Sequence, residues 1–123
     1  MARPRNFDEG VVLAQAADVF GRLGFNAASI DDLVVATGLQ RGSLYKAFGS
    51  KQMLFQIALA GALAPGWSQR PAAIDLLIIA LKELAPGDGA ITALCRAALA
   101  ESGDNTASIL GKRLLEHLND KGN

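Results

Sequence analysis

Residues 29–48 read SIDDLVVATGLQRGSLYKAF, and this run predicts two short helices joined by a tight turn. Ser29 is a favourable helix N-cap, and Asp32 follows three positions later, as in a capping box. Gly38 ends the first of these helices, and the second begins after Gln40. Two short helices across a glycine-containing turn form a helix-turn-helix, in which one helix rests on a duplex backbone while the next enters the major groove.

The rest of the chain is also predicted to be helical. Of its 123 residues, 50% are hydrophobic and 6% are aromatic, which excludes a disordered chain, a collagen-like fibre and a disulfide scaffold. Apolar residues recur with a helical period, and no stretch alternates as a strand would. We therefore predict an all-α protein of about seven helices. Outside residues 29–48, helices are expected between Asp8-Glu9 and Gly24, over 51–64 and 71–85, from Asp88 to about 101, and over 105–119.

Several protein classes are excluded by single features of the sequence. Residues 1–5 lead into no apolar core and so do not form a signal peptide, and the charge-free run 52–69 is interrupted by Pro65, so no membrane span is predicted. The lone Cys95 is expected to be a small buried apolar residue, and His117 a surface residue favourable to a helix C-terminus. We expect a cytoplasmic protein without metal or cofactor. It is not expected to be an enzyme, because no nucleophile–base pair can be assembled.

The second short helix is expected to present a polar edge to solvent. Leu44 and Phe48 lie four residues apart and would supply its buried contacts. Glutamine and arginine pair with adenine and guanine edges, and hydroxyl and ammonium groups donate to phosphate oxygens. A glycine removes a side chain where a duplex must come close. The candidate DNA-contacting residues of this segment are Gln40, Arg41, Gly42, Ser43, Tyr45 and Lys46.

Two stretches carry a family resemblance, FGRLGFNAASIDDL at residues 20–33 and TGLQRGSLYKAFGSKQMLF at residues 37–55. They are similar to the TetR family of transcriptional repressors, and the likeness covers about residues 3–60. The resemblance implies phosphate contacts by Ser29, Tyr45 and Lys51, base reading by Gln40, Arg41 and Ser43, and a basic arm formed by Arg3 and Arg5.

Two features depart from the family pattern. Gln40 stands where many relatives have serine or threonine, so either the second short helix starts less firmly or Gln40 contacts a base instead. Residues 1–55 hold six basic and five acidic groups, which leaves a net charge of only +1. Binding would therefore depend on the local placement of cations.

The resemblance also implies an organisation and a mode of action. We expect a helix-turn-helix DNA-binding domain over residues 1–50, and over residues 51–123 a connecting helix with a short helical domain for dimerisation or regulation. The expected function is a transcriptional repressor that binds a palindromic operator as a homodimer. Release by a small-molecule inducer stays open, with a ligand between subunits lined by Met53, Phe55 or Trp67. The expected dimer interface consists of Ile91, Leu94, Ala107, Leu110, Gly111, Leu114 and Leu118.

A second interpretation also stays open. The near-neutral charge and the short segment after residue 55 suit a helical protein-interaction module that keeps this fold but lacks specific DNA binding. A selection from random duplexes that yields one palindromic site would eliminate this alternative.

Overall fold

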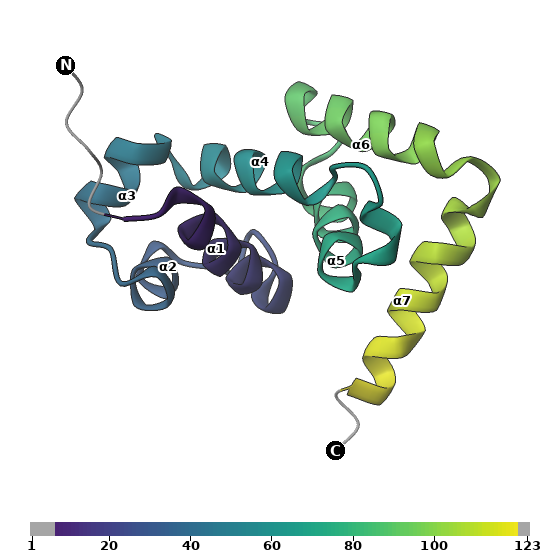
Figure 1. Cartoon of the computed structure of the whole chain (residues 1–123), viewed down its shortest axis with the longest axis horizontal. Helices are drawn as coiled ribbons and strands as arrows, with labels where there is room; N and C mark the ends of the chain where they lie inside the picture. The colour runs from purple at the N-terminus through teal and green to yellow at the C-terminus, as the bar shows by residue number, and fades with distance from the viewer. Residues whose placement is uncertain (1–6, 121–123) are drawn as a thin grey trace. The chain divides into compact units, whose positions relative to one another are not determined.

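Helices dominate the computed structural model, which describes residues 7–120 (Figure 1). Two compact units divide the chain, an N-terminal unit that ends at Ala58 and a C-terminal unit that begins at Leu59. No strand occurs among the described residues, so the predicted all-α class is confirmed. In chain order the elements are α1 (Glu9–Leu23), α2 (Ile30–Thr37), α3 (Arg41–Phe48), α4 (Lys51–Ala62), η1 (Trp67–Gln69), α5 (Pro71–Ile79), η2 (Ala80–Leu84), α6 (Gly89–Ser102), η3 (Gly103–Asn105) and α7 (Thr106–Asp120).

The first helix, α1, begins and ends at the residues expected from the sequence. The carboxylate of Asp8 accepts hydrogen bonds from the backbone N–H groups of Gly10 and Val11 at 2.8 and 3.2 Å. These donors have no partner inside the helix, so the cap satisfies them. Gly24 ends the helix with a φ of 87°, a conformation that glycine adopts without steric cost.

Three phenylalanines form the centre of the N-terminal unit. The rings of Phe20 and Phe55 meet edge to face at 5.1 Å, and Phe25 lies 5.9 Å from Phe20 and 5.4 Å from Phe55. Phe20 and Phe55 have no exposed surface, and Leu33 of α2 and Leu44 of α3 are also buried. Each helix of this unit therefore contributes to its core.

Arg70 closes the end of α4 and precedes α5. Its guanidinium donates to the carbonyl oxygens of Ala62, Ala64 and Pro65 at 3.1, 2.9 and 3.4 Å. Carbonyls at a helix end lack donors within the helix, and the Arg70 side chain supplies those donors. Arg70 is also the N-cap residue of α5, whose first residue is Pro71, as predicted.

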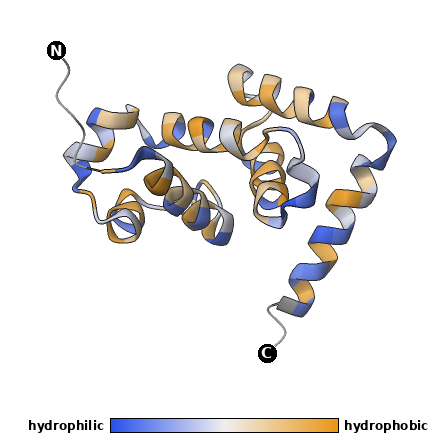
Figure 2. Cartoon of the chain, viewed as in Figure 1, coloured by the Kyte–Doolittle hydropathy of each residue, from blue (hydrophilic) through white to orange (hydrophobic). Residues whose placement is uncertain are grey.

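Apart from Asp75, the α5 helix consists of apolar residues, and most of its length is hydrophobic in Figure 2. Its Leu76 and Leu77 are buried. Both η1 and α7 pack against α5, and α6 packs against the η2 turn that continues it. In η2 the helix widens to a π-helical turn, where the N–H of Ala85 donates to the carbonyl of Ala80 at 2.9 Å.

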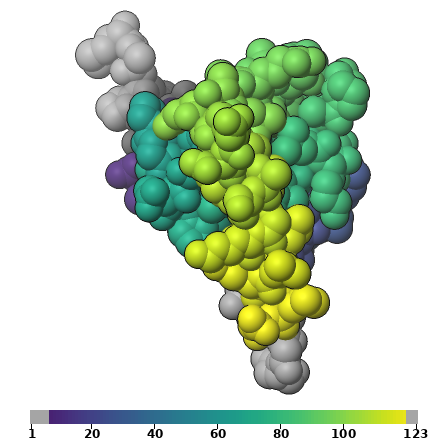
Figure 3. Space-filling view, turned by 90° about the vertical axis from the view of Figure 1, so that its right-hand side faces the viewer, coloured from purple at the N-terminus to yellow at the C-terminus, as the bar shows by residue number. Residues whose placement is uncertain are grey.

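The remaining helices, α6 and α7, complete the C-terminal unit. Asp88 caps α6, as predicted, by accepting from the N–H of Ile91 at 3.0 Å. Hydrophobic and hydrophilic residues alternate along α7 (Figure 2), which runs down the face of the C-terminal unit seen in Figure 3. None of the helices formed by residues 7–120 combines the length and the apolar character needed to span a bilayer.

Candidate nucleic-acid interface

Ser29 and Asp32 anchor the start of α2 through reciprocal hydrogen bonds. The hydroxyl oxygen of Ser29 accepts from the N–H of Asp32 at 3.0 Å, and the carboxylate of Asp32 accepts from the N–H of Ser29 at 2.9 Å. The backbone hydrogen bond from Ser29, reinforced by its side chain, lowers the pKa of Asp32 below its usual value. The predicted capping box is therefore confirmed.

The turn between α2 and α3 depends on a glycine. Gly38 has a φ of 74°, in the left-handed region, and its N–H donates to the carbonyl of Val34 at 2.9 Å. The hydroxyl of Thr37 donates to the carbonyl of Leu33 at 2.7 Å and accepts from the N–H of Leu39 at 3.2 Å. These bonds set where α3 starts, and the two helices form the helix-turn-helix that the sequence predicted.

The α3 helix turns its polar edge to solvent. Leu44 and Phe48 are only 2% and 5% exposed, so they bury the opposite face. Gln40 makes no side-chain hydrogen bond at the helix start, as its replacement of a serine or threonine cap led us to expect. A Cβ added at Gly42 would meet no atom within 4 Å, so packing within the protein does not require a glycine there. All six residues predicted for this edge are exposed, namely Gln40, Arg41, Gly42, Ser43, Tyr45 and Lys46.

Arg41 forms an ion pair that sequence reasoning missed. Its Nη2 lies 2.8 Å from Oδ1 of Asp31, and the side chains of Arg41 and Asp31 are 58% and 81% exposed. Asp31 lies in the first turn of α2. It stands ten residues from Arg41, so no helical periodicity relates the two, and only the fold brings them together.

Lys51, predicted to contact phosphate, is occupied within the N-terminal unit. Its Nζ donates to the carbonyl oxygens of Phe25 and Ala28, both at 2.9 Å, and lies 4.4 Å from the centre of the Phe25 ring. An ammonium group has three donors, so one N–H remains after these two bonds. Lys51 therefore holds the loop between α1 and α2 against the start of α4.

The remaining predicted site residues, those of the basic arm and of the dimer interface, differ in whether they are described and in how far they are buried. Arg3 and Arg5 lie outside the described residues. Ile91 has no exposed surface, so its side chain belongs to the core of the C-terminal unit and is not available to a partner. The other predicted interface residues are half-buried (Leu94, Leu110 and Gly111) or exposed (Ala107, Leu114 and Leu118).

The burial and contacts of four other residues correct or confirm what the sequence led us to expect of them. Phe55 and Trp67 have no exposed surface, so neither lines a ligand site between subunits; Met53 is 44% exposed. Cys95 is buried, as predicted, and burial raises the pKa of its thiol. His117 is not a free surface residue, because its Nε2 lies 2.8 Å from Oδ1 of Asp75.

Asp75 is the centre of a polar cluster between α5 and α7. Arg113 donates to both of its carboxylate oxygens, at 2.8 and 3.0 Å, and these two side chains are only 14% and 16% exposed. Arg113 also lies 3.2 Å from Glu116. Burial by itself would raise the pKa of Asp75, but the hydrogen bonds from Arg113 and His117 outweigh it and hold this pKa below its usual value.

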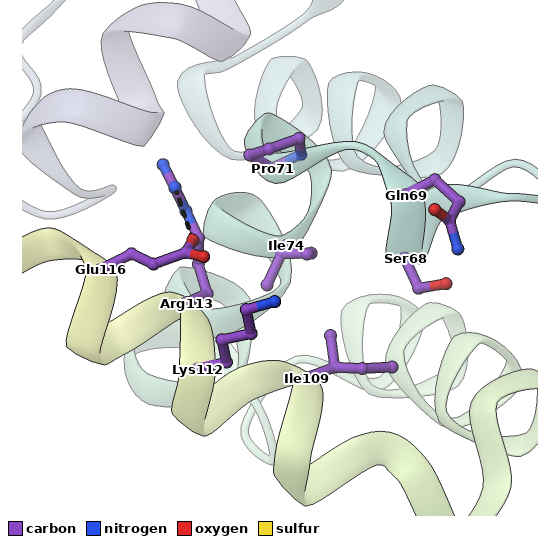
Figure 4. Close-up of a pocket in the computed structure, with 8 residues that line it drawn as sticks. All are labelled: Ser68, Gln69, Pro71, Ile74, Ile109, Lys112, Arg113 and Glu116. Atoms are coloured by element: carbon purple, nitrogen blue, oxygen red, sulfur yellow. Dashed lines mark hydrogen bonds and ion pairs between the residues drawn. The ribbon is translucent and has the colours of Figure 1, made fainter.

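A cleft of about 310 Å³ lies beside this cluster (Figure 4). Arg113 and Glu116 stand at one end of it and Ser68 and Gln69 at the other, while Lys112 rises from α7 between them. Pro71, Ile74 and Ile109 form the apolar part of its lining.

The N-terminal unit matches known proteins. Residues 12–58 match the family described as "Bacterial regulatory proteins, tetR family". The N-terminal unit is therefore similar to this family over the matched residues. One similar protein is the "Uncharacterized HTH-type transcriptional regulator YezE" of Bacillus subtilis, 40% identical over 63 residues, which are 51% of this chain and 32% of the relative.

A second relative is the "HTH-type transcriptional repressor ComR" of Escherichia coli, 40% identical over 57 residues, which are 46% of this chain and 27% of the relative. The matched segment spans about a third or less of each of these two curated relatives. No solved structure matches the chain.

Proposed function

We propose that the protein is a sequence-specific DNA-binding transcriptional regulator, a repressor that binds a palindromic operator as a homodimer. The supporting observation is the exposed polar edge of α3, with Arg41 at its first position and Leu44 and Phe48 buried behind it. The N-terminal residues of a recognition helix are those that reach base edges. The match of residues 12–58 to a family of bacterial regulatory proteins and the similarity to a relative named as a repressor support the same proposal.

Pairing of two copies is proposed to use α7. Leu114, Leu115 and Leu118 are 51%, 65% and 70% exposed, which is unusual for three leucines so close together. Ala107 and Gly111 are small and would let a second helix approach closely. A twofold dimer presents two recognition helices in opposite directions, and this symmetry matches a palindromic operator.

Two substitutions on α3 test the DNA-binding proposal. Arg41→Ala should weaken operator binding by about 1–3 kcal/mol for each half-site and relax the preference at one base pair. Lys46→Ala should weaken all duplexes alike and reduce the slope of log affinity against log salt by about 1, because it removes one phosphate contact. Fluorescence anisotropy with labelled operator and scrambled duplexes measures both effects.

The two variants serve as controls for each other, because each removes one exposed cation from the same helix. Arg41→Ala that weakens operator and scrambled duplex equally would contradict base reading by α3. If the unmodified chain binds no duplex, the proposal is wrong, and the alternative of a helical protein-interaction module is favoured.

Release by an inducer is proposed to use the cleft beside α7. Two cations, Lys112 and Arg113, line the cleft. Arg113 forms an ion pair with Asp75, whereas Lys112 forms none among the described residues. Three apolar side chains close to one available cation suit a small anion with an apolar body. Octanoate should therefore lower operator affinity, and Lys112→Gln should weaken the octanoate effect about tenfold. Lys82→Gln, on an exposed lysine of η2, is the matched control. An equal response from both variants would reject this cleft as the inducer site.

A further inference from the structure

We propose that Asp31 and Arg41 act together as one reading unit for a G·C-containing step of the operator. Arg41 donates to guanine, and Asp31 accepts from the exocyclic amino group of a cytosine on the opposite strand, at the same base pair or the next. This inference rests on the proposed DNA-binding function and names a specificity-determining residue outside α3.

The ion pair between Asp31 and Arg41 joins two helices and is exposed to solvent. Its two side chains come from different helices, from the second residue of α2 and the first residue of α3, and their atoms approach to 2.8 Å. At 58% and 81% exposure neither side chain is held by packing. Exposed ion pairs contribute little to stability, so the fold does not depend on this one and both side chains are accessible to a ligand.

The ion pair leaves donors on Arg41 and an acceptor on Asp31 that can bond to base edges. The pair uses one N–H of Nη2 of Arg41, so the second N–H of Nη2 and the adjacent N–H of Nη1 or Nε still form a fork for the O6 and N7 acceptors of guanine. It uses Oδ1 of Asp31, so Oδ2 remains as an acceptor. The carboxylate also restricts the rotamers of Arg41, which reduces the entropy that the guanidinium loses on binding.

Phosphates repel a carboxylate at a DNA-binding surface, and donors to its two oxygens offset that repulsion. Arg41 supplies the donor to Oδ1 of Asp31, so a donor from a base edge would serve Oδ2. In the major groove the donors are the amino groups of cytosine and adenine, and carboxylates typically accept from cytosine N4. Because Asp31 lies 2.8 Å from Arg41, this cytosine must lie next to the guanine that Arg41 contacts. The amino group of the cytosine in a G·C pair, or in the neighbouring pair on the opposite strand, satisfies that condition.

The competing interpretation is that Asp31 only masks Arg41. In that case the ion pair would have to open before DNA binds, and Asp31 would lower the affinity for every duplex without any effect on sequence preference. The two interpretations predict opposite results for the same substitution.

The test is a selection from random duplexes with the full chain, its Asp31→Ala variant and a matched control, Asp18→Ala. Asp18 is an exposed aspartate that also pairs with an arginine, Arg22, at 2.9 Å. We expect Asp31→Ala to keep the guanine preference and to lose about tenfold or more of the discrimination at the adjacent cytosine. Asp18→Ala should leave both preferences unchanged.

The outcomes separate this inference from the function on which it rests. Tighter binding of Asp31→Ala to all duplexes with unchanged preferences overturns the inference and leaves the proposed function standing. An unmodified chain that enriches no sequence overturns the proposed function, and the inference with it. Circular dichroism of each variant confirms that the helices are retained.

Discussion

Phe55→Ala should destabilise the N-terminal unit by about 3–5 kcal/mol, the range for removing a buried aromatic ring. Phe55 has no exposed surface and meets Phe20 and Phe25 edge to face, with ring centroids at 5.1 and 5.4 Å. Such ring pairs contribute about 0.5–1.5 kcal/mol beyond the area they bury. A loss of this size is comparable with the whole stability of a small domain, so the unit should be largely unfolded at 37 °C, about body temperature.

Urea unfolding followed by circular dichroism measures the effect of Phe55→Ala. Met53 lies two residues away on the same helix and is 44% exposed, so Met53→Ala is the matched control and should cost well under half as much. Phe55→Leu retains an apolar side chain and should recover part of the loss. Equal stabilities for the two alanine variants would show that the three rings do not form the core of this unit.

Arg113→Ala should destabilise the C-terminal unit by about 3 kcal/mol, toward the lower end of the range for breaking a buried ion pair. Arg113 donates two hydrogen bonds to Asp75, and the two side chains are 16% and 14% exposed. After its removal, the carboxylate of Asp75 keeps His117 as a partner but loses a bidentate cation. Arg113→Lys should recover only part of the stability, because one ammonium cannot reproduce the planar fork.

The cluster of Asp75, Arg113 and His117 makes the free energy of unfolding depend on pH in the acid range. The folded-state pKa of Asp75 is below its ordinary value of 3.8, so its ionised form stabilises the folded protein above that value. This contribution is lost as the pH falls through the lowered pKa. Asp75→Asn should therefore flatten the acid side of a plot of unfolding free energy against pH. Asp104→Asn, on an exposed aspartate, is the control, and an identical acid side for both variants would contradict the role of Asp75.

The helix boundaries could be predicted because their causes are local. Asp8, Ser29 and Asp88 cap the helices that follow them, and each cap bond spans three residues or fewer. Gly24 and Gly38 end helices by adopting positive φ, which the sequence signals directly. Caps and stops of this kind require no knowledge of tertiary structure.

Polar contacts between distant residues could not be predicted in the same way. Lys51 reaches carbonyls that precede it by 26 and 23 residues, and Arg113 reaches a carboxylate 38 residues away. Periodicity identifies which face of a helix is polar but not which group lies opposite it. For the same reason Ile91, an apolar residue on a helix, was assigned to a dimer interface although the core of its own unit covers it. The π-helical turn at residues 80–84 had no sequence signal that we recognise.

The guanidinium of Arg70 has a consequence for how α4 and α5 come apart. The last carbonyl of α4, that of Ala62, and the carbonyl of Ala64 just beyond it accept from this side chain, while the backbone of the same residue is the N-cap of α5. Fraying of one helix terminus would withdraw a support from the other, so local opening at this corner is cooperative and not independent.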